Sequence, residues 1–281
     1  MKKIIFLIAF ILIYVEITNA QRSIPDDNLA YPVFILLTNG SSGTGFFINS
    51  KSGTYLVTCK HVLFDRKNKL LSNKGDFFSS SKNLQDKTQN HFQINLKYMY
   101  ENNLLKYNPK YDVAILKIGT ILALDSLQYQ INLFDSVKVI SSSKSGIVGV
   151  NERDIKMYDE VLVANDIYIF GYPTSLGIPE SPQFDYFKPL LRKGIIAGKY
   201  DDLKTIILDC PVYFGNSGGP VLQSTFKGFG GFEFNVIGVV SEFIPFAETW
   251  VNATQQYSNI SISNSGYSVC VSMDVVLEML K

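Results

Sequence analysis

The chain has 281 residues, of which 46% are hydrophobic, and its 26 lysines and arginines nearly balance its 25 aspartates and glutamates. With a formal net charge of +1 it offers no strongly basic surface, so nucleic acid and anionic membranes are not expected as partners. The length is ample for a hydrophobic core and fits one large all-β domain or two small ones. Two histidines and three cysteines stand at spacings that match no zinc pattern, so we expect no metal and no cofactor.

Residues 1–20 have the pattern of a secretory signal peptide. Two lysines precede an apolar run from Ile4 to Val15, and the small residue Ala20 follows a short polar stretch. The run is shorter than the about 20 residues that cross a bilayer. We therefore expect cleavage after Ala20, a mature chain of residues 21–281 without a membrane span, and a secreted or periplasmic location. A buried N-terminal helix or an uncleaved anchor is the alternative.

Short runs rich in β-branched and aromatic residues recur along the rest of the chain, bounded by Gly, Asn, Ser or Pro, which is typical of strands. They cover residues 31–37, 45–48, 54–58, 112–118, 167–170, 194–198, 205–209, 220–222, 232–240 and 268–271. One amphipathic helix is expected over residues 273–280, with Asp274 as its cap. Many short strands and few helices indicate an all-β sandwich or a pair of barrels.

Three polar stretches are expected to be surface loops, at residues 65–90, 141–159 and 247–265. The middle loop is the expected boundary between an N-terminal barrel, about residues 30–140, and a C-terminal barrel, about residues 160–272. After the helix at 273–281, we expect no appended peptide-binding domain.

The strongest chemical signal is the sequence Gly215-Asn-Ser-Gly-Gly-Pro. A nucleophilic serine needs an exposed hydroxyl on a tight turn and backbone N–H groups aimed at the oxygen that becomes negative during acyl transfer. Glycines permit the backbone dihedrals of such a turn. The pattern predicts Ser217 as the nucleophile and the N–H groups of Gly215 and Ser217 as an oxyanion hole. Taken alone, the motif also fits a glycine-rich hairpin turn before a strand.

Two further residues complete a candidate triad. His61 follows the β-rich run at 54–58 directly, whereas His91 lies in a polar stretch, so His61 is the candidate base. Asp112 opens an apolar run, and burying a charge is costly unless the carboxylate has a task. Orienting an imidazole is such a task. Either residue alone fits an ordinary surface or strand-end position.

The chain order His61, Asp112, Ser217 is the order of the chymotrypsin-type triad. Together with Gly43-Thr-Gly-Phe-Phe-Ile, these motifs resemble the trypsin-like, chymotrypsin-fold serine peptidases over about residues 30–280. The resemblance implies two six-stranded antiparallel β-barrels with the active site between them and a short C-terminal helix. His61 and Asp112 would come from the first barrel and Ser217 from the second.

In detail the chain is more similar to the bacterial HtrA-type and glutamyl-endopeptidase branches, by Ile169-Phe-Gly-Tyr-Pro and Val236-Ile-Gly-Val-Val. Asn216 stands where zymogen-activated trypsins carry an acid, so activation through a salt bridge to a new N-terminus is not expected. The cysteine that follows the histidine in disulfide-bonded trypsins is missing, so the family's usual disulfides are not predicted. The three cysteines are Cys59, Cys210 and Cys270, which leaves open whether any two of them pair.

The resemblance also implies a substrate pocket beside the serine. Its walls would be the segment from Pro211 to Phe214 and the strand Val239-Val240-Ser241. A trypsin-like pocket would carry an acid at Pro211, and a glutamyl-endopeptidase pocket a histidine at Val240. Because neither is present, we expect a small or medium apolar residue at P1.

The sequence therefore predicts a secreted serine endopeptidase that acts on protein or peptide substrates through an acyl-enzyme. One alternative is a catalytically silent, trypsin-fold binding module. A less favoured alternative is an esterase on the same triad. Its usual strand–elbow–helix context is absent, because Ser217 is followed by Gly-Gly-Pro and a strand.

Overall fold

The computed structural model describes residues 24–83, 85–123, 129–174, 183, 185–228, 231–252, 254 and 256–281. The expected signal peptide at residues 1–20 lies outside these ranges. Among the described residues, no helix combines the length and the apolar character needed to cross a membrane.

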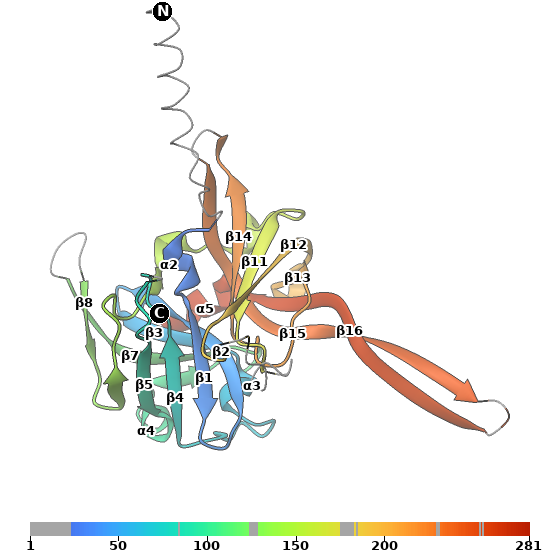
Figure 1. Ribbon diagram of the computed structural model, residues 1–281, viewed down its shortest axis with the longest axis horizontal. Helices are drawn as coiled ribbons and strands as arrows, with labels where there is room; N and C mark the ends of the chain where they lie inside the picture. Colours follow the sequence, from blue (N-terminus) through green and yellow to red (C-terminus); the bar gives the residue numbers. More distant parts are fainter. Residues whose placement is uncertain are drawn as a thin grey trace, which may run out of the picture.

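The first half of the chain builds one ten-stranded sheet (Figure 1). Its main path runs β6-β7-β3-β2-β1-β4-β5-β9, while β10 pairs with β2 and β8 pairs with β7. The strands are β1 (Pro32–Leu37), β2 (Ser42–Ser50), β3 (Gly53–Thr58), β4 (Lys74–Ser79), β5 (Asn90–Asn95), β6 (Leu105–Tyr107), β7 (Ala114–Ala123), β8 (Tyr129–Leu133), β9 (Val137–Ser141) and β10 (Gly149–Asn151).

The second half closes into a six-stranded barrel of order β11-β12-β13-β16-β15-β14. Its strands are β11 (Asp166–Gly171), β12 (Leu190–Tyr200), β13 (Thr205–Asp209), β14 (Pro220–Phe226), β15 (Phe232–Asn252) and β16 (Tyr257–Ser272). The predicted all-β, double-barrel class is confirmed. The first half has ten strands rather than six, because short strands such as β6 and β10 add to it.

Among the described residues, helices are few and short, as the sequence predicts. They are α2 (Asp26–Leu29), α3 (Lys60–Leu63), α4 (Leu96–Glu101) and α5 (Met273–Leu280), with 3₁₀ turns η1 (Glu152–Asp154), η2 (Tyr158–Glu160) and η5 (Asp201–Leu203). The cap of α5 is Ser272, whose side chain accepts a hydrogen bond from the backbone N–H of Asp274. Asp274 lies in the first turn instead, where its negative charge interacts favourably with the positive end of the helix dipole and stabilises the helix.

The two halves share one hydrophobic core. Its larger cluster joins buried side chains of the first sheet, such as Phe46 and Leu56, to Leu222 and Val239 of the barrel. A second cluster fills the barrel interior around Ile169. Because apolar packing runs from one half into the other, residues at their junction are held in fixed relative positions.

Strands β15 and β16 extend far beyond the barrel as a two-stranded arm, which reaches to the right in Figure 1. Their pairing continues from Pro245 opposite Asn264 to Asn252 opposite Tyr257. The expectation of a loop at residues 247–265 is therefore wrong. The alternation of Ser or Asn with isoleucine around Ile260 is a period-two strand pattern.

Both faces of the arm are exposed and carry apolar side chains. Residues directly opposite in an antiparallel pair share a face. By this register one face carries Ala247, Thr249, Val251, Ile260 and Ile262, and the other carries Phe246, Glu248, Trp250, Asn259 and Ser261.

Candidate active site

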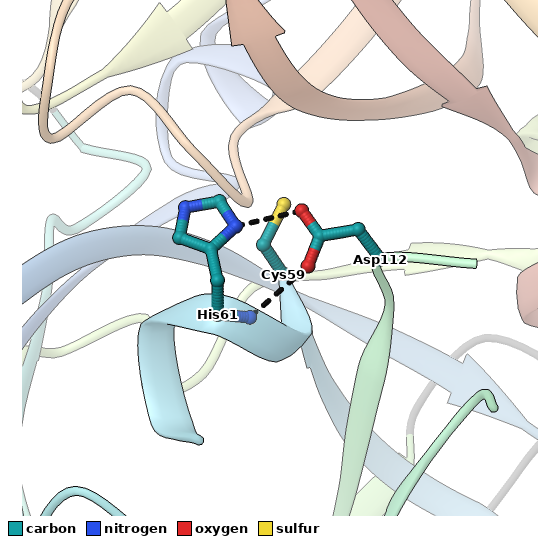
Figure 2. Close-up of side chains that lie close together, drawn as sticks. All are labelled: Cys59, His61 and Asp112. Atoms are coloured by element: carbon teal, nitrogen blue, oxygen red, sulfur yellow. Dashed lines mark hydrogen bonds and ion pairs between the residues drawn. The ribbon is translucent and has the colours of Figure 1, made fainter. Parts of the chain in front are cut away.

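His61 lies in the short helix α3, which begins two residues after β3 ends at Thr58. Its Nδ1 atom is 2.7 Å from Oδ2 of Asp112, and its backbone N–H donates to Oδ1 of the same carboxylate at 3.0 Å (Figure 2). Two contacts to one carboxylate fix both the helix turn and the imidazole ring. The other histidine, His91, instead pairs with Asp76 at 2.8 Å across β4 and β5.

Asp112 precedes β7 and is the centre of a three-donor network. Besides His61 it accepts a hydrogen bond of 2.9 Å from the hydroxyl group of Ser241. Burial acts to raise the pKa of Asp112, but the hydrogen bonds and the charge of His61, with the Ser241 hydroxyl, outweigh it and hold that pKa below its usual range. Asp112 is therefore an acceptor in its ionised form.

His61 shows the complementary shift. Burial acts to lower its pKa, but the hydrogen bond and charge of Asp112, with a smaller contribution from Glu242, raise the pKa above its ordinary value. Because an ionised carboxylate can only accept, Nδ1 of the imidazole carries the proton, and Nε2 is left as the basic nitrogen.

Ser217 lies on a tight turn between the two halves. Gly215 and Gly218 have φ angles of 98° and 88°, in the left-handed region that favours glycine. A Cβ atom on Gly218 would lie 2.0 Å from the carbonyl oxygen of Thr44, so only glycine fits there. The Ser217 hydroxyl donates to the carbonyl oxygen of Ser241 at 3.1 Å.

Thr44, on β2, makes hydrogen bonds to this turn at both Gly215 and Ser217. The sequence alone did not predict a role for it. Its backbone N–H donates to the carbonyl oxygen of Ser217 at 2.9 Å, and its hydroxyl donates to that of Gly215 at 2.6 Å. The same hydroxyl accepts from the N–H of Tyr172 at 3.1 Å. The side chain is fully buried. Its one trace in the sequence is the Gly-Thr-Gly motif that begins at Gly43.

The structure separates the residues that the sequence proposed for the substrate pocket. Val239 and Val240 are fully buried in the two hydrophobic clusters. Ser241 is directed to Asp112. Pro211 is half-buried, whereas Phe214 is 70% exposed.

An aromatic pair bridges the two segments next to Ser217. The rings of Phe214 and Phe243 lie edge to face with centroids 5.9 Å apart. Phe214 precedes the serine by three residues, and Phe243 follows Ser241 by two. Only the fold brings these two segments together, so the sequence predicts Phe214 at the pocket and gives no signal for Phe243.

All three cysteines are buried and free. Burial raises the pKa of Cys210 to about 11, and burial followed by the charge of Asp112 raises that of Cys59 well above its ordinary value. Cys59 lies beside the histidine and aspartate (Figure 2). Within the described chain, one group of three residues of the types His, Cys, Asp or Glu has its possible metal-ligand atoms within 4.8 Å of one another. This group is Cys59, His61 and Asp112.

A cavity of about 420 Å³ opens next to His61 and Asp112. Its lining includes Lys60, Phe64 and Arg66. It therefore gives solvent and small solutes access to the imidazole and the carboxylate from the side of the first half.

The family model of the trypsin-like peptidase domain matches residues 43–230. Among solved structures the chain is similar to Deg5, with a TM-score of 0.47 and 16% identity over 89% of this chain and 87% of that one. It is also similar to a thermostable serine protease, AL20, from an extremophilic microorganism, with a TM-score of 0.45 and 12% identity over 89% and 93% of the two chains.

A third similar structure is the HtrA-type protease AlgW with a tripeptide, with a TM-score of 0.46 and 16% identity over 90% of this chain. The chain spans 59% of the length of that protein. No curated protein sequence matches the chain. Because the family model covers well over half of its residues, the chain belongs to the trypsin-like peptidase domain family.

Proposed function

We propose that the protein is a serine endopeptidase in which His61, Asp112 and Ser217 act as a catalytic triad. The observation that carries the proposal is the network around one carboxylate. Asp112 holds the imidazole of His61 at 2.7 Å and, through Ser241, is connected to the hydroxyl group of Ser217. The membership of the trypsin-like peptidase family supports protein or peptide substrates.

In the proposed mechanism, Nε2 of His61 takes the proton of the Ser217 hydroxyl as Oγ attacks the scissile carbonyl carbon. Asp112 keeps Nδ1 protonated and stabilises the imidazolium that forms. The imidazolium then gives its proton to the leaving amine, which leaves an acyl-enzyme on Ser217. Water, deprotonated by His61, attacks the ester and releases the acid.

The negative oxygen of each tetrahedral intermediate would be bound by the backbone N–H groups of Gly215 and Ser217. The contacts of Thr44 support this assignment. Thr44 donates hydrogen bonds to the carbonyl oxygens of Gly215 and Ser217 and does not accept one from the N–H group of either residue. Each such donor typically contributes about 3 kcal/mol of barrier lowering.

For the substrate pocket we propose walls formed by residues 211–214 and by the segment of β15 that leads to the arm, Ser241 to Phe243. The edge-to-face pair of Phe214 and Phe243 narrows the space between these walls. A small apolar P1 residue is therefore favoured. Replacement of Phe243 by glycine should shift cleavage in a peptide library towards larger P1 side chains, whereas unchanged preference would place the pocket elsewhere.

A secreted or periplasmic location remains part of the proposal, on the pattern of residues 1–20 alone. The second candidate function is a silent binding module. One observation favours it, namely that the Ser217 hydroxyl is bonded to the carbonyl oxygen of Ser241 rather than to His61.

The deciding experiment is labelling of the purified chain from Gln21 onward with a fluorophosphonate probe, which reports an activated serine. Ser217→Ala is the first control. Ser224→Ala is the matched control, because Ser224 lies on β14 away from the triad. We expect labelling in the parent and in Ser224→Ala and none in Ser217→Ala. A folded parent chain that takes no label at neutral or mildly alkaline pH would instead support the binding module.

A further inference from the structure

We propose that Cys59, His61 and Asp112 form a binding site for a thiophilic divalent cation such as Zn²⁺ or Cd²⁺, which would shut off the triad. The three side chains offer a sulfur, a nitrogen and an oxygen ligand whose atoms all lie within 4.8 Å of one another. Their binding of a cation does not depend on the proposed function, whereas the inhibition rests on it.

The donor set suits such a cation. Zinc takes Cys sulfur at about 2.3 Å and His nitrogen or Asp oxygen at about 2.0 to 2.1 Å, in a tetrahedron whose ligands stand about 3.5 Å apart. To reach this spacing, Nδ1 and Oδ2 must separate by about 0.8 Å from their distance of 2.7 Å, and a pair of ligand atoms at the 4.8 Å limit must approach by about 1.3 Å. The ion would replace the hydrogen bond between Nδ1 and Oδ2, and the side chain of His61, which is 53% exposed, has room to move once that bond is broken.

The ion can reach His61 and Asp112 from the cavity that these two residues help to line, whereas Cys59 is fully buried next to them. Lys60 lines this cavity, but its ammonium group lies 4.4 Å from the ring centre of Tyr107, held over that ring. Arg66 and Asp65 at the lining balance each other in charge. The fourth ligand would be a water molecule supplied through the same opening.

Binding of the cation releases one proton to water. The thiol of Cys59 loses its proton to water as its sulfur bonds the metal, because a coordinating thiol is deprotonated. The carbonyl oxygen of Val240, which accepts from this thiol at 2.9 Å, keeps the N–H of Gly218 as a donor at 2.8 Å. The imidazole remains neutral, with its proton moved from Nδ1 to Nε2 by way of solvent.

This tautomer change is what would stop catalysis. The proposed mechanism needs a free electron pair on Nε2 of His61, and metal at Nδ1 forces that nitrogen to carry the proton. Asp112 would also lose its role as the partner of the imidazolium. Cys59 is the residue of this chain that adds the third ligand to a histidine–aspartate pair.

The test uses the chain from Gln21 onward and titrates it with Cd²⁺, followed by the ultraviolet cadmium–thiolate charge-transfer band. Cys59→Ala and His61→Ala are the site variants, and Cys210→Ala is the matched control because Cys210 is equally free and buried. We expect a band at one Cd²⁺ per chain in the parent and in Cys210→Ala. Loss of a ligand in either site variant should weaken binding by about 10-fold or more. An unchanged band in Cys59→Ala, or no band in the parent, overturns the site.

A second arm measures fluorophosphonate labelling of Ser217 with and without Zn²⁺. We expect Zn²⁺ to suppress labelling in the parent and in Cys210→Ala, at a concentration about 10-fold lower or more than in Cys59→Ala. Equal suppression in Cys59→Ala overturns the inhibition. Circular dichroism of each variant separates ligand loss from unfolding. A parent that never takes the label would sink the proposed peptidase function, while the cadmium titration would still decide the metal site.

Discussion

The hydroxyl group of Ser217 donates its hydrogen bond to the carbonyl oxygen of Ser241, at 3.1 Å. Among the residues that the structure describes, no hydrogen bond joins this hydroxyl to His61. Catalytic hydrogen bonds in unliganded peptidases are often long or poorly aligned and tighten when substrate binds. Because Thr44 holds the backbone of the turn, we expect the hydroxyl group to change partner by rotation about the Cα–Cβ bond of Ser217.

We therefore expect Ser217 Oγ to leave the Ser241 carbonyl when a transition-state analogue is bound. Crystal structures of the free chain and of the chain with a peptide aldehyde would measure the distance from Oγ to Nε2 of His61. The adduct should bring the oxygen within hydrogen-bond range of the imidazole, about 2.6 to 3.2 Å. If the serine stays on the Ser241 carbonyl and no adduct forms, the silent-module alternative gains.

The pH dependence of activity follows from the raised pKa of His61. Because the neutral imidazole is the base, kcat/KM should fall as the pH drops through a pKa above the ordinary value of about 6.5. Profiles of labelling rate against pH would measure this limb, and Asp112→Asn should lower the rate by about 10⁴-fold through the wrong tautomer. An acid limb below the ordinary histidine value would contradict the Asp112 pairing.

Folding stability responds to the same pair with opposite signs. The raised pKa of His61 gives stability that is complete below its ordinary value and is lost as the pH rises through the folded-state value. The lowered pKa of Asp112 gives stability above the ordinary aspartate value that is lost as the pH falls through the folded-state value. The pair thus favours folding most strongly in mildly acidic solution, which urea denaturation at several pH values would test against Asp112→Asn.

Thr44 is expected to matter for both stability and turnover. Thr44→Val keeps the shape but leaves the carbonyl of Gly215 and the N–H of Tyr172 without their buried partner. We expect a loss of about 1 to 3 kcal/mol in the free energy of unfolding. The looser oxyanion turn should also lower kcat by up to about 10²-fold with little change in KM. Thr44→Ser, which keeps the hydroxyl, should restore kcat; an equal loss in both variants would assign Thr44 to packing alone.

Trp250 should make the intrinsic fluorescence a reporter of the arm. It is the single tryptophan of the chain and is 64% exposed in β15. We expect a native emission maximum close to that of tryptophan in water, strong quenching by acrylamide and little change in urea. Far-ultraviolet circular dichroism, which follows the barrel strands, is the reference. A blue-shifted and protected emission would mean that the arm is covered in solution.

Local patterns were enough to predict much of the fold and of the site. The strand runs and the order of His61, Asp112 and Ser217 predicted an all-β double barrel, which the structure and the family match confirm. The roles of those three residues stay predictions. The network that surrounds them could not be read from the sequence, because Ser241 and Thr44 come from strands far apart in the chain and have no spacing signal of their own.

The prediction of a loop at the residues of the arm was wrong for a different reason. Residues 247–265 are rich in Ser, Asn and Thr, and this polar composition predicts a loop, whereas the alternation of polar and apolar residues predicts a strand. A strand that packs against nothing on either face lacks the half-buried pattern by which strands are normally recognised. The spacing of Cys59 along the chain likewise matches no metal-binding pattern. Its nearness to Asp112 arises in the fold, because β3 ends just before Cys59 and β7 begins just after Asp112.

The arm and Ser241, which contacts both Ser217 and Asp112, lie on one continuous strand. β15 leaves the barrel core at Val240, passes Ser241 and enters the arm after two register shifts, between Val240 and Glu242 and between Phe243 and Pro245. Ser241 thus stands where a long exposed ribbon joins a closed barrel. The carbonyl oxygen of Ser241 accepts from Ser217 and its hydroxyl group donates to Asp112, so both contacts are made at this junction. A displacement of the ribbon that carried Ser241 with it would therefore change the hydrogen bonds of Ser217 and Asp112 together.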